Sequence, residues 1–190
     1  MAEIGVLCKL GVFSLDVVPD TQRPLSTRLV LKIKRKADGS YDKHKARLVV
    51  RGFLAKQGVD YYSTYSPMSN LITARTIMAI AVERGLPICH ADIPQAFVQA
   101  SLGRSIFCDF PKGISIAPTV LERVQKSHPN SKIGIKLLKS LYGLKNAPLY
   151  WSILLNQHLT KLGFSRSQNY ACLYTYEVSA TGTFCAIPVF

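Results

Sequence analysis

A pair of alternating segments around an Asp-Gly dipeptide constrains the fold of this chain most. In residues 28–36 apolar and basic side chains alternate, and the alternation returns in residues 45–51. Between the two segments stands Asp38-Gly39, a dipeptide typical of tight hairpin turns. Because successive side chains of a strand point to opposite faces, these segments predict an antiparallel hairpin with one apolar and one basic face. We expect the apolar face to pack against the rest of the protein and the basic face to bind phosphates.

The positive charge of the chain is concentrated around this hairpin. The 190 residues include 24 lysines and arginines against 11 acidic residues, a net charge of +13. Residues 23–56 hold eleven lysines and arginines against Asp38 and Asp42, a net charge of +9. This concentration favours a polyanionic partner, with nucleic acid ahead of a membrane surface. The alternative is a solvated basic face without a partner.

Composition narrows the class of protein and its location. Hydrophobic residues make up 48% of the chain and charged residues 18%, proportions typical of a folded globular protein. No apolar run approaches the roughly 18 residues of a membrane helix, and the first residues show no signal peptide. We therefore expect no membrane association and an intracellular location, cytoplasmic or nuclear. The five cysteines are scattered and show no CxxC pair, which favours buried thiols over disulfides or zinc ligands.

The remaining pattern alternates helices and strands. A helix is predicted from the stripe Ala74, Ile77, Met78, Ala81 and Val82, capped by Ser69 or Asn70 and ended by Gly85, with its stripe in the core. The other predicted elements are a buried strand at 86–93, a helix at 94–100, strands at 105–110 and 132–139, a loop at 111–131, a turn at 140–143, a helix at 148–162 and a hairpin of 172–178 with 183–190, turning near 181–182. This order predicts an α+β fold, an antiparallel sheet with helices on one face.

Asp92 is the main candidate for chemistry. It stands at the end of the predicted strand 86–93, where a sheet edge meets a helix start, a usual place for functional groups. Phe97 follows five residues later and is suited to wall a nucleotide sugar. The alternatives are a helix cap for Asp92 and a core aromatic for Phe97.

Two further segments are candidates for nucleotide or nucleic-acid contacts. The turn of residues 140–148 combines Gly143 and Lys145 with a helix start, which could receive a base pair and phosphate oxygens. A plain entry turn into a helix is the alternative. The connection 57–70 carries Tyr61, Tyr62 and Tyr65, which could stack on bases or pack over the core.

Together these segments resemble the reverse transcriptase of copia-type long-terminal-repeat retrotransposons. The matching strings include Lys-Ala-Arg-Leu-Val-Val-Arg-Gly-Phe (45–53), Gly-Val-Asp-Tyr (58–61), Tyr-Ser-Pro (65–67) and Ala-Asp-Ile-Pro-Gln-Ala-Phe (91–97). Later matches are Phe-Pro-Lys-Gly (110–113), Leu-Lys-Ser-Leu-Tyr-Gly-Leu-Lys-Asn-Ala-Pro (138–148) and Leu-Gly-Phe (162–164). Their order and spacing agree across nearly the whole chain.

The resemblance implies a division of labour along the chain. Residues 1–66 would form a fingers-like subdomain with the basic hairpin, and residues 67–190 a partial polymerase palm. The implied function is RNA-directed DNA synthesis, with an RNA template, a DNA primer, deoxynucleotides and Mg²⁺. The oligomeric state stays open.

The resemblance also implies roles for individual residues. Asp92 would be the first catalytic carboxylate and a metal ligand, with the Ile93 carbonyl beside it. Phe97 would be the gate that favours deoxynucleotides. The implied nucleotide-binding residues also include two groups: Lys45, Arg47 and Arg51, facing the triphosphate or the template, and Tyr142, Gly143 and Lys145, in the loop against which the incoming nucleotide and template base pack.

The chain departs from the family pattern in its carboxylates. The family places an aromatic-x-Asp-Asp hairpin shortly after the last predicted strand, whereas after Asp92 this chain has only Asp109, Glu122 and Glu177. Mg²⁺ prefers hard oxygen ligands, and one carboxylate cannot hold two such ions in close register. We therefore expect a fingers-palm fragment that is inactive alone, with an incomplete metal site. The alternatives are a non-catalytic nucleic-acid-binding protein derived from a retroelement and a fragment that does not fold stably.

Overall fold

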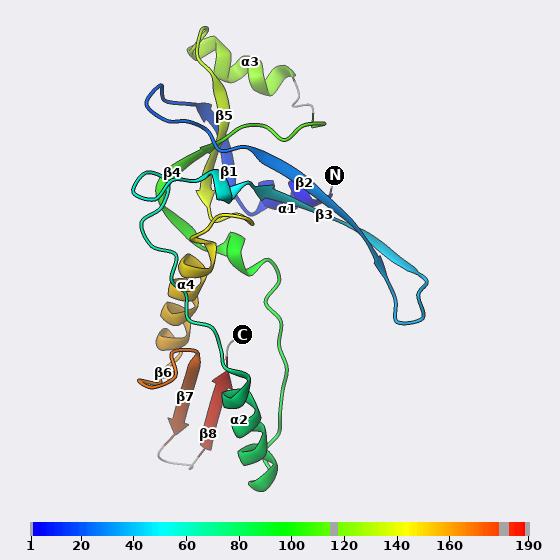
Figure 1. Ribbon diagram of the computed structural model, residues 1–190, viewed down its shortest axis with the longest axis vertical. Coiled ribbons are helices and arrows are strands. Elements are labelled where there is room, and N and C mark those ends of the chain that lie inside the picture. Colours follow the sequence, from blue (N-terminus) through cyan, green and yellow to red (C-terminus); the bar gives the residue numbers. More distant parts are fainter. Residues whose placement is uncertain (1, 115–117, 179–182, 189–190) are drawn as a thin grey trace. The chain divides into compact units, whose positions relative to one another are not determined.

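The computed structural model describes residues 2–114, 118–178 and 183–188 (Figure 1). The chain divides into two compact units. The first unit comprises Met1–Thr64 and Gln95–Tyr150, and the second comprises Tyr65–Pro94 and Trp151–Phe190. Each unit combines helices with antiparallel strands, which confirms the predicted α+β class. The division into fingers (1–66) and palm (67–190) stays a prediction.

The predicted basic hairpin is present in the first unit. Strands β2 (Thr27–Arg35) and β3 (Tyr41–Val50) pair antiparallel, and the turn between them places Gly39 at a φ of +84°. The Asp38 carboxylate accepts a hydrogen bond of 2.9 Å from the Ser40 amide, which closes the turn. The Asp-Gly signal therefore marked the turn correctly.

The apolar face of the hairpin is docked only at its base. Leu48 is buried there with 1% of its surface exposed, whereas Leu31 and Ile33 toward the turn are 75% and 54% exposed. The expectation of a fully docked face was therefore wrong for the outer half. Helix α1 (Ala2–Lys9), which was not predicted, contributes Leu7 to the same buried cluster as Leu48.

A three-stranded antiparallel sheet forms the other half of the first unit. Its order is β1 (Phe13–Val17), β5 (Ile133–Lys139), β4 (Ser101–Cys108), so β5 is central. The predictions for β4 and β5 are confirmed, whereas β1 was not predicted. In β1, Phe13 lies opposite Leu137 of β5.

Helix α3 (Pro118–Ser127) corrects the predicted loop at 111–131. It lies against β1 and β5. Its half-buried Leu121 and Val124 are three residues apart on one helix face, and Pro118 stands at the first helical position. Two apolar residues are too few to show a helical period, so periodicity in the sequence could not distinguish this helix from a loop.

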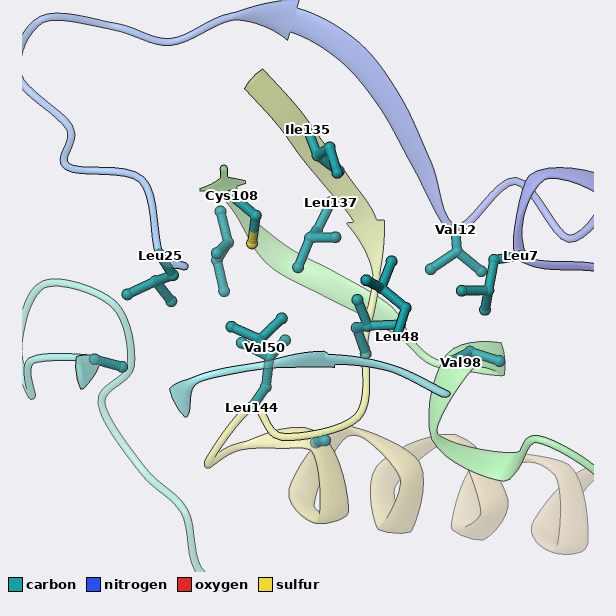
Figure 2. Packing of buried hydrophobic residues seen from close by; sticks show 14 residues of the cluster. Leu7, Val12, Leu25, Leu48, Val50, Val98, Cys108, Ile135, Leu137 and Leu144 are labelled. Carbon is teal, nitrogen blue, oxygen red and sulfur yellow. The ribbon is translucent and has the colours of Figure 1, made fainter. Parts of the chain in front are cut away.

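The hydrophobic core belongs to the first unit. Figure 2 shows Leu48 and Val50 of β3 beside Leu137 of β5. The fourteen residues of the buried cluster are Leu7, Val12, Leu25, Leu48, Val50, Ala55, Val98, Ile106, Cys108, Ile135, Leu137, Leu141, Leu144 and Ala147. They come from both the hairpin and the sheet, so burial of one cluster holds these two elements together.

In the second unit, the predicted helix is α2 (Leu71–Glu83). Asn70 caps it, because its side-chain oxygen accepts a hydrogen bond of 2.9 Å from the Ile72 amide. The stripe is buried only in part. Ala74 is buried, whereas Met78 and Val82 are 50% and 75% exposed, so the expectation of a core stripe was wrong at those two positions.

The predicted helix at 148–162 and the predicted C-terminal hairpin are present, whereas the short strand β6 (Ser165–Arg166) between them was not predicted. Helix α4 (Ala147–Lys161) contributes to both units, and Gly163 follows it with a φ of +91°. Strands β6, β7 (Leu173–Val178) and β8 (Thr183–Pro188) then form an antiparallel sheet in that order. The predicted turn at 181–182 and the last predicted strand residues, 189–190, lie outside the described residues.

The predicted buried strand at 86–93 is wrong. These residues form no helix or strand and are exposed, with Ile88 at 57%. Pro87 and Pro94 lack the amide hydrogen that a central strand must donate, which explains why the apolar run does not join a sheet. The helix expected at 94–100 is reduced to the 3₁₀ turn η2 (Ala96–Gln99); a second such turn, η1 (Gly52–Leu54), follows β3.

Candidate nucleic-acid interface

The basic face of the hairpin places like charges directly opposite one another. Lys32 pairs with Lys45 across the strands, and Lys34 pairs with Lys43. Next along the same face, Arg47 lies opposite Val30. Like charges at opposed positions destabilise a hairpin, so this face is favourable mainly when anions neutralise it. Residues two apart on a strand are separated by about 7 Å, so the cations form a regular ladder.

Lys45 sits at the most enclosed point of this ladder. Its side chain is half-buried, whereas Lys43 and Arg47 are exposed. Partial burial lowers the pKa of Lys45, and the charges of Arg47, Lys34 and Lys43 lower it further, while Glu3 of α1 opposes them. Both causes disfavour the ammonium, and a bound anion beside it would raise the pKa of Lys45 again.

The turn of residues 140–148 abuts the base of the hairpin. The Tyr142 carbonyl accepts a hydrogen bond of 2.8 Å from the Val50 amide. Gly143 has a φ of +88°, and a Cβ atom there would overlap the carbonyl oxygen of Val50. A Cβ atom on Gly52 would in turn overlap the carbonyl oxygen of Gly143. The two glycines therefore allow a backbone approach that no other residue type permits.

An aromatic and cationic cluster forms where this turn meets β3. The rings of Phe97 and Tyr142 meet edge to face, with centroids 6.2 Å apart. The Arg47 guanidinium lies 5.8 Å from the centroid of the Tyr142 ring. Burial raises the pKa of Tyr142, so its hydroxyl stays protonated at neutral pH, although Arg47 acts in the opposite direction. Phe97 also packs against the buried cluster, so it serves the core as well.

Lys145 is held by a tyrosine from a different segment. Its ammonium nitrogen lies 3.2 Å from the Tyr61 hydroxyl oxygen, to which it donates a hydrogen bond. The same nitrogen lies 5.0 Å from the centroid of the Tyr61 ring. An exposed lysine that would otherwise sample many rotamers is thus fixed at the end of the turn.

The structure brings most of the predicted nucleotide-binding residues together in one unit. Arg47, Phe97 and Tyr142 are in contact, and Gly143 and Lys145 lie on the same turn as Tyr142. Arg51 directly follows β3, is exposed, and donates its backbone amide hydrogen to the Ser26 carbonyl.

Asp92 and Ile93 belong to the second unit instead. Both are exposed, Ile93 at 44%. The capping alternative for Asp92 does not hold, because η2 begins at Ala96 and its N-cap is Gln95. Gln95 has a φ of +54°, a conformation that a residue with a side chain seldom adopts. In sequence this residue lies between Asp92 and Phe97, at the N-cap of η2.

The side chains present do not by themselves fit a two-Mg²⁺ site. In residues 2–114, 118–178 and 183–188 there is no group of three His, Cys, Asp or Glu side chains that could hold a metal ion. Asp92 offers a hard oxygen ligand of the right kind but only one carboxylate. No metal-dependent step follows from the described residues.

Tyr61 and Arg104 are two residues of this region whose roles the sequence did not reveal. The Arg104 guanidinium lies 4.5 Å from the Tyr62 ring centroid, and it donates a hydrogen bond to the Val59 carbonyl. Tyrosines in the connection 57–70 were a visible signal. No sequence signal marked Arg104. It is a single cation in a strand, and its partner Tyr62 lies about forty residues earlier in the sequence.

A ladder of cations beside an aromatic cluster is typical of surfaces that bind nucleotides or nucleic acids. No helix in the described part of the chain has the length and apolar character needed to cross a membrane. The family model for reverse transcriptase (RNA-dependent DNA polymerase) matches residues 11–187. The chain belongs to this family, which confirms the resemblance drawn from its motifs.

The relatives of the chain include polyproteins of transposons. It is 32% identical to the retrovirus-related Pol polyprotein from transposon TNT 1-94 of Nicotiana tabacum, over 90% of the chain and 12% of that protein. It is 31% identical to the corresponding polyprotein from transposon RE1 of Arabidopsis thaliana, over 89% of the chain and 11% of that protein. The match to the transposon Ty1-ER2 Gag-Pol polyprotein of Saccharomyces cerevisiae is 25% over 90% of the chain and 9% of that protein.

The chain thus corresponds to a small part, about a tenth, of these curated relatives. The part of the relatives that it matches is the reverse transcriptase domain of copia-type Pol polyproteins. No solved structure matches it significantly.

Proposed function

We propose that this chain supplies the nucleic-acid-binding and nucleotide-binding part of an RNA-directed DNA polymerase from a retrotransposon. The observation that carries the proposal is the cluster of Arg47, Phe97 and Tyr142 at the base of the cation ladder. A ladder alone would suit any polyanion. An aromatic pair beside it offers a surface for a sugar or a base at the same place.

The cations of the hairpin act on phosphates. Lys45, Arg47 and Arg51 face the triphosphate of the incoming deoxynucleotide or the backbone of the template. Arginine can pair with two phosphate oxygens at once through its planar guanidinium, whereas lysine acts as a point charge. In this proposal residues 1–66 act as fingers and residues 67–190 as part of a palm.

The residues around the turn act on the sugar and the base. Phe97 stands as the gate that disfavours a ribose 2′-hydroxyl, held by its edge-to-face contact with Tyr142. Tyr142, Gly143 and Lys145 form the loop against which the new base pair packs. The close approach of Gly143 to β3 and the anchor of Lys145 on Tyr61 keep this loop in one conformation.

Asp92 is the proposed metal ligand, with the Ile93 carbonyl beside it. Bound Mg²⁺ would activate a primer hydroxyl and stabilise charge on the transferred phosphoryl group. Asp92 provides one carboxylate for this purpose, and the remaining ligands are not found among the described side chains. An RNA template and a DNA primer are the proposed partners, and the cytoplasm or nucleus the proposed place of action.

The second candidate is a non-catalytic nucleic-acid-binding protein derived from a retroelement. The cation ladder favours it, because binding phosphates through Lys32, Lys45 and Arg47 requires no metal ion. The two candidates share the same interface and differ only in whether Asp92 takes part in chemistry.

The test compares binding and synthesis in two variants. In the first, Lys45, Arg47 and Arg51 are all changed to Glu; in the second, Asp92→Asn is made alone. Binding of a labelled RNA-template and DNA-primer duplex should be lost in the first variant and kept in the second. Charge reversal of Arg75, Arg84 and Lys161, three exposed cations of the second unit, is the matched control and should reduce binding much less.

Incorporation of deoxynucleotides in the presence of Mg²⁺ tests whether Asp92 takes part in chemistry. Synthesis that Asp92→Asn abolishes would support a polymerase site and would contradict the expectation that the chain is inactive alone. Tight binding without synthesis is expected of both candidates, because one carboxylate does not hold two Mg²⁺ ions. Equal loss of binding from charge reversal at the hairpin and at the control positions would contradict both.

A further inference from the structure

The loop of residues 56–62 is held in shape by its own hydrogen bonds. The Lys56 amide donates to the Asp60 carboxylate at 2.7 Å, and the Asp60 amide donates to the Lys56 carbonyl at 2.8 Å. The Gly58 amide donates to the Tyr61 carbonyl at 2.8 Å. A loop fixed in this way presents its side chains at low entropic cost to binding.

The two tyrosines at the end of the loop have opposite surroundings. Tyr61 is half-buried, packs against the core cluster and holds Lys145. Tyr62 has 69% of its surface exposed. Packing over the core, the commoner use of such a residue, therefore accounts for Tyr61 and leaves Tyr62 unexplained.

A guanidinium accompanies the exposed ring. Arg104 of β4 lies 4.5 Å from the centroid of Tyr62, within the range of a cation–π contact. Arg104 also donates a hydrogen bond to the Val59 carbonyl of the same loop. Arginine has five N–H donors, so this bond leaves others for an anion.

We propose that Tyr62 and Arg104 form a site for a single-stranded segment of nucleic acid. An unpaired base stacks on the exposed Tyr62 ring, and the Arg104 guanidinium pairs with a phosphate beside it. Every base has a π-face, so the site accepts any base sequence. This inference rests on the proposed nucleic-acid binding, and it adds a second contact surface, distinct from the cation ladder of β2 and β3.

The measurement that tests this proposal compares two oligonucleotides of equal charge. One is a fluorescein-labelled 12-nucleotide DNA strand of mixed sequence, and the other has the same backbone with abasic sites throughout. Their affinities for the full chain are measured by fluorescence anisotropy at one fixed salt concentration. Because the phosphates are the same, the affinity ratio isolates the contribution of the bases.

The wild-type chain should prefer the strand with bases. Tyr62→Leu should lower the affinity for that strand by about 5- to 100-fold, the size expected for removal of one stacking aromatic. The affinity for the abasic strand should change little. Tyr62→Phe keeps the ring and should retain the preference, which shows that any loss in Tyr62→Leu does not come from a disturbed loop.

A control variant is Tyr170→Leu, which removes another exposed tyrosine, in the second unit, and should leave the preference intact. A wild-type preference that Tyr62→Leu leaves unchanged would overturn the site while leaving the proposed function standing. Equal binding of both strands by the wild type would also overturn it. A chain that binds neither strand would overturn the proposed function and the site together.

Discussion

The two units of this chain contain similar kinds of elements but bury very different amounts of apolar surface. The first unit contains all fourteen residues of the core cluster. In the described part of the second unit, the buried hydrophobic residues are Ala74, Ala81, Leu159 and Tyr174. Large apolar residues such as Ile72, Val82 and Ile88 remain exposed there.

This difference between the units shows which elements form from signals next to them in the sequence and which need contacts between distant segments. Helix α2 forms because Asn70 caps it and Gly85 follows it, signals that lie next to it in the sequence. The core of the first unit forms because β3 and β5, far apart in the sequence, bring Leu48 and Leu137 into one cluster. Substitutions in the two units test this contrast.

Truncation of a core leucine should have the largest effect. Leu137→Ala removes a side chain that is 2% exposed at the centre of the first unit, and should lower the free energy of unfolding by about 2–5 kcal/mol. Val82→Ala in the second unit removes a side chain that is 75% exposed, and should change it by less than about 0.5 kcal/mol. Urea denaturation followed by circular dichroism measures both. Equal destabilisation would contradict the contrast between the units.

Alanine at Gly143 should have the next largest effect. Gly39→Ala is the matched variant, because Gly39 has a similar φ of +84° but nothing within 4 Å of the added Cβ. Gly39→Ala should lower the free energy of unfolding by about 1–2 kcal/mol, because alanine is strained at a positive φ. Gly143→Ala adds an overlap with the Val50 carbonyl, and so should cost more and weaken oligonucleotide binding as well. The account fails here if Gly39→Ala is the more harmful of the two in urea denaturation.

Loss of the α2 cap should have a moderate effect. Asn70→Ala removes the acceptor for the Ile72 amide and should reduce stability by about 1 kcal/mol. Asn70→Asp restores an acceptor and should recover most of that loss. Thermal unfolding monitored at the helical circular-dichroism band measures the change. An Asn70→Ala variant as stable as the wild type would show that the cap does not determine this helix.

The ion pair of Asp16 and Lys136 should have the smallest effect. The Lys136 ammonium donates a hydrogen bond of 3.0 Å to the Asp16 carboxylate and lowers the pKa of that carboxyl below its ordinary value of 3.8. A depressed pKa contributes stability above the ordinary value, and this contribution is lost as the pH falls through the folded-state pKa.

Asp16→Asn should therefore be slightly less stable than the wild type at neutral pH, by less than about 1 kcal/mol, because the pair is only partly buried and solvent still screens it. The difference should shrink in acid. Urea denaturation at neutral pH and in acid provides the comparison, and a difference that grows as the pH falls would contradict the assigned direction.

The sequence predicted the elements whose signals are local and regular. The hairpin of β2 and β3 followed from alternation and Asp38-Gly39, and α2 followed from Asn70 and Gly85. The strand predicted at 86–93 was wrong because the prediction rested on apolar character and gave no weight to Pro87, which lacks the amide hydrogen that a central strand must donate. Helix α3 was missed because its apolar stripe is two residues long in the described side chains.

The site residues that belong to recognisable sequence motifs could be predicted. Arg47, Phe97 and Tyr142 were each selected from the sequence, and the structure places them in contact. Their contact depends on the close approach of Gly143 to Val50, a distance relationship that no spacing along the chain reveals. The pairing of Arg104 with Tyr62 was invisible for the same reason. The roles of Asp92 and of the other site residues in catalysis stay predictions.

The salt dependence of nucleic-acid binding tests the central claim, that the cation ladder of the first unit binds phosphates. The affinity of the wild-type chain for a 12-nucleotide single strand is measured between about 50 and 200 mM salt. The account predicts a steep linear decrease of log affinity with log salt concentration, shallower by about 0.7 in slope for each cation removed in Lys32→Met and Lys45→Met. A slope near zero, or one that both substitutions leave unchanged, would contradict it.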